Sequence, residues 1–429
     1  MNYIRSVFSK NKDTDNIKNI NEEGQSDVQI DKYLFNSNCG AKNLVCKFPS
    51  IQDDKIKKCM EKPDIVGEGG FNRVCLIESN DKEKYALRLT LNDWTEENDK
   101  IVEDEIKGLE YQALLSKTKE EGGLECPYVA KVKSFGHLTK TGHKYSKAYG
   151  LLEFLEGGDL YDFMKVIPKN NLITTFTVPK IKIIALKLLK TLNCIHKSGY
   201  VYLDLKPENI MLNKKNNITD IKLVDFGLLK KNAAVGSLSG TPGYVAPLMI
   251  FEYFTTTKVS FKYAFDIWSF GIILLELVVG VDFDQLMDIQ ADIFESKIDH
   301  KKGLEKYNSI LTSFKTEFIN IHTGEDKKNA IDFIDLIFNI KNNTTAEQLL
   351  NHSWLQNVEE EPLERINIKD DVFGNIVLPN NNVGNDENPA IEKENSIIGG
   401  KSKKNKKTKK NKKTKKFKKT KKYRKSKKI

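Results

Sequence analysis

A single eight-residue loop constrains this chain more than any other stretch. It runs from Tyr202 to Asn209, reads Tyr-Leu-Asp-Leu-Lys-Pro-Glu-Asn, and places a carboxylate, a lysine and an amide close together. In such a loop Asp204 can orient an attacking hydroxyl and accept its proton, Lys206 can neutralise a transferring phosphate, and Asn209 can hold a metal ion. The residue types therefore favour phosphoryl transfer, although a polar turn between an apolar helix and an apolar strand also fits the loop taken alone.

Three further motifs follow this loop in order. They are the stretches 225–227, Asp-Phe-Gly, 240–247, Gly-Thr-Pro-Gly-Tyr-Val-Ala-Pro, and 266–271, Asp-Ile-Trp-Ser-Phe-Gly. The order and spacing of the four blocks resemble the C-terminal lobe of eukaryotic-type serine/threonine protein kinases, and several spaced motifs agree by chance far more rarely than any one of them. The resemblance implies an α+β, bilobal protein-kinase fold with a small β-rich N-lobe and a larger helical C-lobe.

The same resemblance implies roles for single residues. Asp204 and Lys206 would be catalytic, and Asn209 and Asp225 would hold Mg²⁺ or Mn²⁺. Asp266 would anchor the catalytic loop by accepting backbone N–H groups from it. These roles make ATP and a divalent metal ion the expected cofactors.

A glycine-rich stretch opens the region that resembles a kinase domain. It covers residues 65–74 and reads Ile-Val-Gly-Glu-Gly-Gly-Phe-Asn-Arg-Val. Glycines lack a Cβ atom, so backbone N–H groups can approach phosphates closely, and by resemblance this stretch is the lid over ATP. Asn72 stands where the family usually has a third glycine. The expected ATP contacts are Val66, Gly67, Glu68, Gly69, Gly70, Phe71, Asn72, Arg73 and Val74.

Arg88 occupies the place of the lysine in the Val-Ala-Ile-Lys motif of kinases. The alternating stretch 85–89 predicts a half-buried strand, and an acidic amphipathic helix follows it. By resemblance a helix glutamate should pair with residue 88. Glu105 is the predicted partner and Glu110 the alternative, and either could instead be a solvated surface charge.

Further ATP contacts are implied on both sides of the adenine ring. Val74 and Ala86 would cover the ring from above, and Met211 would lie beneath it. Backbone groups of Glu153 and Leu155, in the expected hinge, would form hydrogen bonds with the adenine.

Two apolar segments predict buried helices of the C-lobe. Ile184, Leu188, Leu189, Leu192 and Ile195 recur at helical spacing, so His196 after them is predicted to be structural and not catalytic. The apolar run 265–281 carries Asp266 and Glu276 and is shorter than the roughly 20 residues that span a bilayer, so it predicts a buried helix and no transmembrane segment.

The composition divides the 429 residues into four parts. Residues 1–55 are predicted to be a disordered extension, 56–360 a kinase domain, 361–400 a polar linker and 401–429 a lysine-rich tail. The six cysteines form no Cys-x-x-Cys pair, which predicts reduced thiols. No apolar leader follows Met1, so an intracellular location, cytoplasmic or nuclear, is expected.

The tail carries most of the basic charge. It repeats in lysine-rich triplets and holds 18 Lys and one Arg without an acid, so the other 400 residues carry a net charge of −9. Such a block repels itself and predicts binding to nucleic acid or another polyanion, although a nuclear address or a solubilising segment would also explain it. The Lys, Asn and Ile bias resembles proteins of large DNA viruses, which would add the host cell or the virion as locations.

Two functions compete. The first is an ATP-dependent serine/threonine kinase acting on a protein substrate, and the second is a pseudokinase or scaffold whose tail is its working part. The departures from the kinase pattern, Arg88, Leu203 and Leu248, support the second. Leu248 replaces a glutamate whose usual arginine partner is Asn343 here, so no buried charge is orphaned. A slow or specialised kinase is the favoured interpretation.

Overall fold

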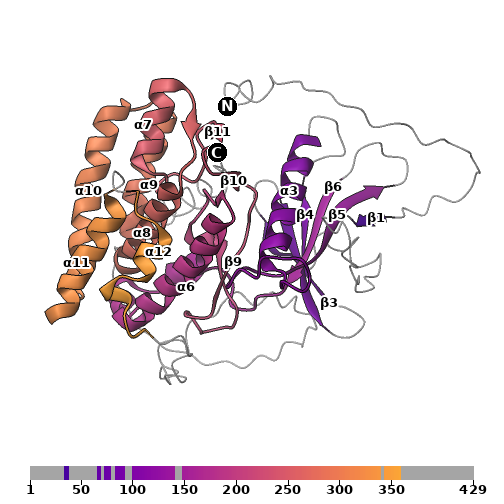
Figure 1. The fold of residues 1–429 in the computed structure, drawn as a ribbon, viewed down its shortest axis with the longest axis horizontal. Helices are drawn as coiled ribbons and strands as arrows, with labels where there is room; N and C mark the ends of the chain where they lie inside the picture. Colours follow the sequence, from indigo (N-terminus) through magenta and orange to yellow (C-terminus); the bar gives the residue numbers. More distant parts are fainter. Residues whose placement is uncertain are drawn as a thin grey trace, which may run out of the picture. The chain divides into compact units, whose positions relative to one another are not determined.

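The computed structural model describes residues 33–37, 65–68, 72–78, 83–91, 99–140, 147–339 and 343–358. The lysine-rich tail, the polar linker and most of the N-terminal extension lie outside these ranges. Within them a β-rich N-lobe precedes a helical C-lobe, which confirms the predicted α+β bilobal fold (Figure 1).

An antiparallel sheet with the strand order β1-β5-β6-β4-β3-β2 forms the N-lobe. Its strands are β1 (Tyr33–Ser37), β2 (Ile65–Glu68), β3 (Asn72–Glu78), β4 (Lys84–Thr90), β5 (Val132–Lys140) and β6 (Lys147–Glu153). Strand β1 lies within residues 1–55, the extension predicted to be disordered. It pairs with β5 and satisfies the backbone groups of an edge that would otherwise be open.

Helix α3 (Asp99–Ser116) packs against β5 and β6. Its Leu109 and Ala113 join Val132, Phe135 and Leu152 of the sheet in a separate apolar cluster. Glu105 precedes Leu109 by one helical turn and therefore lies on the same face of the helix. The apolar packing of α3 thus turns the Glu105 carboxylate toward the sheet.

The C-lobe is built from helices around one large apolar core. They are α4 (Leu160–Val166), α5 (Lys169–Thr175), α6 (Val178–Lys197), α7 (Pro247–Thr256), α8 (Tyr263–Val279), α9 (Asp284–Phe294), α10 (His300–Asn320), α11 (Gly324–Phe338) and α12 (Ala346–Leu350). Every residue of α8 after Tyr263 is buried, as predicted for the apolar run beginning at Phe265. In the part of the chain that the structure describes, no helix has the length and apolarity needed to cross a membrane.

Helix α6 presents the predicted apolar stripe to this core. Ile184, Leu188, Leu189, Leu192 and Ile195 are all buried there. After α6 the chain forms the short strand β7 (Tyr200–Val201), the catalytic loop with the 3₁₀ turn η2 (Pro207–Asn209), and the hairpin of β8 (Ile210–Leu212) with β9 (Ile221–Leu223). The rigid helix and the hairpin hold the two ends of the loop.

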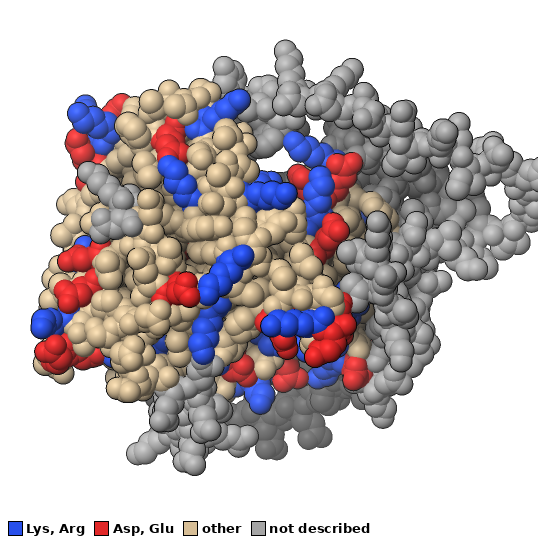
Figure 2. Space-filling view, in the orientation of Figure 1, with Lys and Arg blue, Asp and Glu red and all other residues tan. Residues whose placement is uncertain are grey.

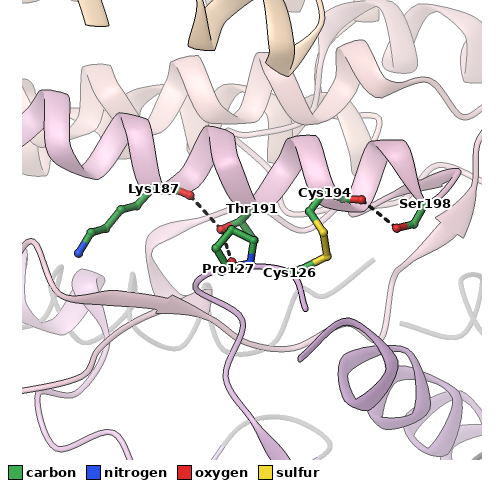
Figure 3. Close-up of a disulfide and its surroundings, with 6 residues drawn as sticks. All are labelled: Cys126, Pro127, Lys187, Thr191, Cys194 and Ser198. Carbon is green, nitrogen blue, oxygen red and sulfur yellow. Dashed lines mark hydrogen bonds between the residues drawn. A yellow bond between two sulfur atoms is a disulfide. The ribbon is translucent and has the colours of Figure 1, made fainter. Parts of the chain in front are cut away.

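A disulfide joins Cys126, in the turn between α3 and β5, to Cys194 of α6 (Figure 3). The two Cα atoms are 5.5 Å apart, within the usual range for a disulfide. Next to it, Thr191 Oγ1 donates to Pro127 O at 2.9 Å and helps to hold the turn against α6. The prediction of reduced thiols is therefore wrong for this pair and also for Cys75, which is disulfide-bonded. Cys126 and Cys194 are 68 residues apart, and only the fold brings them together.

Candidate active site

Asp204 is a buried carboxylate that accepts hydrogen bonds from three side chains. Lys206 Nζ lies 3.0 Å from each carboxylate oxygen, and Thr241 Oγ1 donates to Oδ1 at 2.7 Å. Asn209 Nδ2 donates to Oδ2 at 2.9 Å and to the Asp204 carbonyl oxygen at 2.7 Å. Lys206 Nζ also donates to Thr241 Oγ1 at 2.7 Å, which closes the set. We call these four residues the Asp204 web, and they hold the carboxylate in one orientation.

Asp266 of α8 anchors the start of the catalytic loop. Its Oδ2 accepts from Tyr202 N at 2.7 Å and its Oδ1 accepts from Leu203 N at 2.8 Å. Leu203 has a left-handed φ of 68°, a conformation that is costly for a leucine and needs such support. His196 Nε2 lies 2.8 Å from Asp266 Oδ2 and is buried, so the histidine supports the anchor and agrees with its predicted structural role.

Tyr202 links the catalytic loop to the segment that carries Asp225. Its hydroxyl donates to Val224 O at 2.5 Å, and its ring meets Phe226 edge-on with ring centres 5.1 Å apart. Burial, with a smaller effect of the Asp204 and Asp225 charges, raises the pKa of Tyr202 well above its ordinary value. The phenol therefore stays protonated and remains a donor.

The donor set fits a divalent metal ion at Asn209 and Asp225. Both hydrogen bonds of the Asn209 amide to Asp204 use Nδ2, so its Oδ1 faces the other way and can serve as a ligand. Mg²⁺ prefers such oxygen ligands and usually keeps waters and phosphate oxygens in its remaining positions. The described residues contain no group of three His, Cys, Asp or Glu side chains that could hold a metal ion.

Arg88 of β4 bridges two carboxylates. Its Nη2 donates to Glu105 Oε2 at 3.0 Å and its Nε lies 2.6 Å from Glu105 Oε1, so one hydrogen bond and one close ionic contact join the two side chains. The same Nη2 donates to Asp225 Oδ1 at 3.2 Å. Burial alone would lower the pKa of Arg88, but Asp225 and Glu105 together raise it. The predicted pairing with Glu105, and not with Glu110, is present in the structure.

Asn72, the residue in the place of a glycine, also reaches Glu105. Its Nδ2 donates to Glu105 Oε2 at 2.9 Å. The Arg88, Glu105 and Asp225 side chains are 14%, 11% and 12% exposed, so these contacts are largely shielded from water. We call Asn72, Arg88, Glu105 and Asp225 the Arg88 cluster.

Gly108 lets helix α3 approach the Asp-Phe-Gly segment closely. A Cβ atom at residue 108 would lie 2.9 Å from Gly227 Cα and 3.0 Å from Gly227 N, closer than real Cβ atoms come. Sequence reasoning missed this residue. The available signal was a glycine inside a helix, which is unfavourable and often marks a packing requirement.

The residues expected to contact adenine come from both lobes. Val74, Ala86 and Met211 are half-buried, and Leu155 is buried. Glu153 N donates to Lys131 O at 3.0 Å, so that N–H is already engaged. The Glu153 side chain pairs with Lys222 Nζ at 2.6 Å, which ties the hinge to β9.

The glycine-rich stretch is described only at its two ends. Val66 is exposed, and Gly67 lies opposite Val74 across the β2–β3 pair. Arg73 Nε pairs with Glu68 Oε2 at 3.0 Å on the same hairpin, away from the Arg88 cluster. The predicted contacts Gly69, Gly70 and Phe71 lie outside the described residues.

The loop after Gly240 is held by polar residues that sequence reasoning missed. Gln290 of α9 accepts from Gly243 N at 2.7 Å and donates to Val245 O at 2.8 Å. Tyr307 of α10 donates to Gly243 O at 2.8 Å. These contacts position the segment that carries Thr241. No local sequence pattern predicts them.

Leu248 and Asn343 stand where the kinase pattern has a glutamate and its arginine partner, and neither leaves a buried charge unpaired. Leu248 is half-buried against the apolar core, whereas Asn343 is exposed. Tyr244 hydroxyl donates to the buried Glu276 Oε2 at 2.5 Å nearby. The loop keeps a buried polar anchor without the ion pair.

Charges on the surface are mixed. On the face shown in Figure 2, basic and acidic side chains are interspersed among uncharged residues and do not gather in one patch. That face therefore shows nothing comparable to the concentration of lysines in residues 401–429.

Comparisons with known proteins agree with this geometry. The family model described as a protein kinase domain matches residues 60–355. A probable myosin light chain kinase of Dictyostelium discoideum is 27% identical over 309 residues, covering 70% of this chain and 85% of its own. A calcium/calmodulin-dependent protein kinase type 1 of Macrobrachium nipponense is 25% identical over 315 residues, covering 72% and 77%. The mouse cAMP-dependent protein kinase catalytic subunit PRKX is 26% identical over 308 residues, covering 71% and 74%.

Proposed function

Because the chain belongs to the protein kinase family, we propose that it is an ATP-dependent serine/threonine kinase that phosphorylates a protein substrate. The observation that carries the proposal is the Asp204 web. It presents a buried, fully oriented carboxylate beside a lysine and a hydroxyl, on a loop that also offers an amide oxygen to a metal ion.

The reaction follows from the positions of these groups. Asp204 accepts the proton of the substrate hydroxyl, whose oxygen forms a bond to the γ-phosphorus while the bond to the β-phosphate oxygen breaks and ADP leaves. Lys206 Nζ supplies positive charge beside the transferred group. Asn209 and Asp225 would hold Mg²⁺ or Mn²⁺, which neutralises charge on the phosphates when it is bound.

Two features support serine or threonine as the acceptor. Lys206 follows the catalytic aspartate by two residues, the arrangement of serine/threonine kinases in the family pattern. Thr241 contacts both Lys206 and Asp204, so the loop that docks the substrate is joined directly to the catalytic residues.

We expect slow turnover because Arg88 replaces a lysine. A planar guanidinium does not present its charge as a compact ammonium does, and a misplacement of about 1 Å costs about 100-fold in rate. Against about 1–100 s⁻¹ for typical kinases, about 0.01–1 s⁻¹ would remain. That rate is measurable.

A second function, a pseudokinase or scaffold, is favoured by one contact. Arg88 Nη2 lies 3.2 Å from Asp225 Oδ1, so the arginine competes with a metal ion for one of the two carboxylate oxygens. In this alternative the protein binds nucleotide or partners without transferring phosphate.

One experiment separates the two functions. Purified protein is incubated with labelled ATP, Mg²⁺ or Mn²⁺ and a Ser/Thr peptide, beside the Asp204→Asn and Asp225→Ala variants. Transfer by the wild type that both variants lose supports the kinase. If a wild-type protein that melts cooperatively transfers no phosphate, the pseudokinase or scaffold function is supported instead.

The tail is proposed to bind polyanions. With 19 basic residues between 401 and 429, its binding to DNA or anionic vesicles should weaken steeply as salt rises. Truncation after Gly400 should abolish this binding and leave phosphotransfer intact. An unchanged salt dependence in the truncated protein would refute the assignment.

A further inference from the structure

Two departures from the kinase pattern meet on one carboxylate. In the β3–β4 pair Asn72 lies opposite Thr90 and Val74 lies opposite Arg88. Residues directly opposite each other share a face of the sheet, as do residues two apart, so Asn72 and Arg88 are diagonal neighbours on one face. Helix α3 brings Glu105 to that face, where both side chains donate to it.

Glu105 Oε2 accepts from Asn72 Nδ2 at 2.9 Å and from Arg88 Nη2 at 3.0 Å, while Oε1 lies 2.6 Å from Arg88 Nε. One carboxylate oxygen can accept two hydrogen bonds, so both donors fit. The amide of Asn72 thereby limits rotation of the carboxylate and keeps its two oxygens facing the edge of the guanidinium. A glycine at residue 72 would have no side-chain donor for the Glu105 carboxylate.

The carbonyl oxygen of the Asn72 side chain bears on the role of this residue. Its Oδ1 is buried and has no hydrogen-bond partner in the described part of the protein. An unpaired buried acceptor is unfavourable, so the amide does not serve stability well. Its donor bond to Glu105 is the contact for which this residue type is suited.

We infer that Asn72 is a positioning residue that works with Arg88. Asn72 orients the Glu105 carboxylate, which orients the Arg88 guanidinium. The guanidinium in turn holds the Asp225 carboxylate in position. The glycine-rich stretch is thereby coupled to the proposed metal-binding carboxylate. The inference rests on the proposed nucleotide binding and makes one distinctive claim, that the two departures are energetically coupled.

A double-mutant cycle tests the coupling. The affinity for ATP with Mg²⁺ is measured by calorimetry for the wild type, Asn72→Ala, Arg88→Lys and the double variant, with kcat and KM for a peptide recorded separately. Asn72→Ala should weaken ATP binding about tenfold in the wild type, the change expected when a hydrogen bond to a charged group is lost. In the Arg88→Lys background the same change should be less than about twofold.

Matched variants separate positioning from folding. Asn213 Nδ2 donates to Asp220 Oδ2 at 2.9 Å, the same kind of bond in the β8–β9 turn. Asn213→Ala should leave ATP affinity unchanged, whereas Asn72→Ala should lower it. Asn72→Gln, which keeps the donor, should recover part of the affinity, whereas Asn72→Asp should lose more because two carboxylates then face each other.

Each result is decisive. Equal effects of Asn72→Ala in the two backgrounds, with normal ATP binding by the wild type, would overturn this inference and leave the proposed function standing. Coupled binding without any phosphotransfer would overturn the proposed function and support the inference. No ATP binding by folded wild-type protein would overturn both.

Discussion

The Asp204 web and the Arg88 cluster each hold carboxylates between nitrogen donors, yet they are assembled differently. Asp204, Lys206 and Asn209 lie within one short loop, and only Thr241 comes from a later segment. The Arg88 cluster draws on β3, β4, α3 and the segment at Asp225, which is 137 residues from Arg88.

This difference shows how two departures from the kinase pattern can be accommodated together. In a local web, the loop backbone fixes most of the distances between the side chains. In a distributed cluster, a longer guanidinium at one position can be matched by a new donor at another. Arg88 and Asn72 form such a pair, and both departures lie in the distributed cluster.

The largest expected effect is at the local web. Asp204→Asn removes the proton acceptor and should lower phosphotransfer about a thousandfold, because general base catalysis contributes roughly 10²–10⁴. ATP affinity should change little, since Asp204 is outside the Arg88 cluster. Labelled transfer and calorimetry on one preparation test both statements. A loss of ATP binding would show that the two groups are not separate.

The disulfide joins the turn after α3, the helix that carries Glu105 of the distributed cluster, to the C-lobe. Changing both Cys126 and Cys194 to serine should lower the free energy of unfolding by about 4 kcal/mol, from the chain entropy of a 68-residue loop. Denaturant unfolding measures the change. Thr191→Val is the control and should cost only about 1 kcal/mol, because it removes one neutral hydroxyl, which donates to Pro127 O and Lys187 O. An unchanged midpoint in the double variant would contradict the prediction.

Arg88→Lys probes the cluster itself. The slow rate expected with Arg88 is relative to kinases whose whole site is built around a lysine, whereas here Glu105 and Asn72 are arranged around the guanidinium. A lysine at residue 88 would lose the contacts with Glu105, so we expect the rate to fall about tenfold and not to rise. The rate of the Arg88→Ala variant should fall further, because Glu105 and Asp225 then have no shared cation. Peptide phosphorylation by the three proteins gives the order. A faster Arg88→Lys variant would mean that the cluster is not adapted to arginine.

The smallest effect should follow dephosphorylation. Leu203 stands where kinases with an arginine grip a phosphorylated residue, so a phosphate on Ser237 or Ser239 should not gate activity. Thr241, the other candidate acceptor in this segment, is buried, and its hydroxyl is engaged in the Asp204 web. Phosphatase treatment should change the rate by less than about tenfold. A larger loss would reveal a switch of about 1.4 kcal/mol or more with a different anchor.

Much of the fold could be predicted from the sequence because its signals are local. The helical spacing in α6 and the apolar run of α8 each specify a buried face without reference to the rest of the chain. Strand β1 could not be predicted, because its residues gain structure only from the open edge of β5. Its pairing is a property of the assembled sheet.

The sequence by itself determined the order of the kinase motifs, the chemistry of the residues in them and the concentration of lysines in the tail. Each of these is a matter of residue type and spacing along the chain. The tertiary structure decided which distant residues meet: Asn72 with Glu105, Cys126 with Cys194, and Gly108 with Gly227. Such contacts depend on ångström-scale distances between packed helices and strands, and residue spacing along the chain does not set those distances.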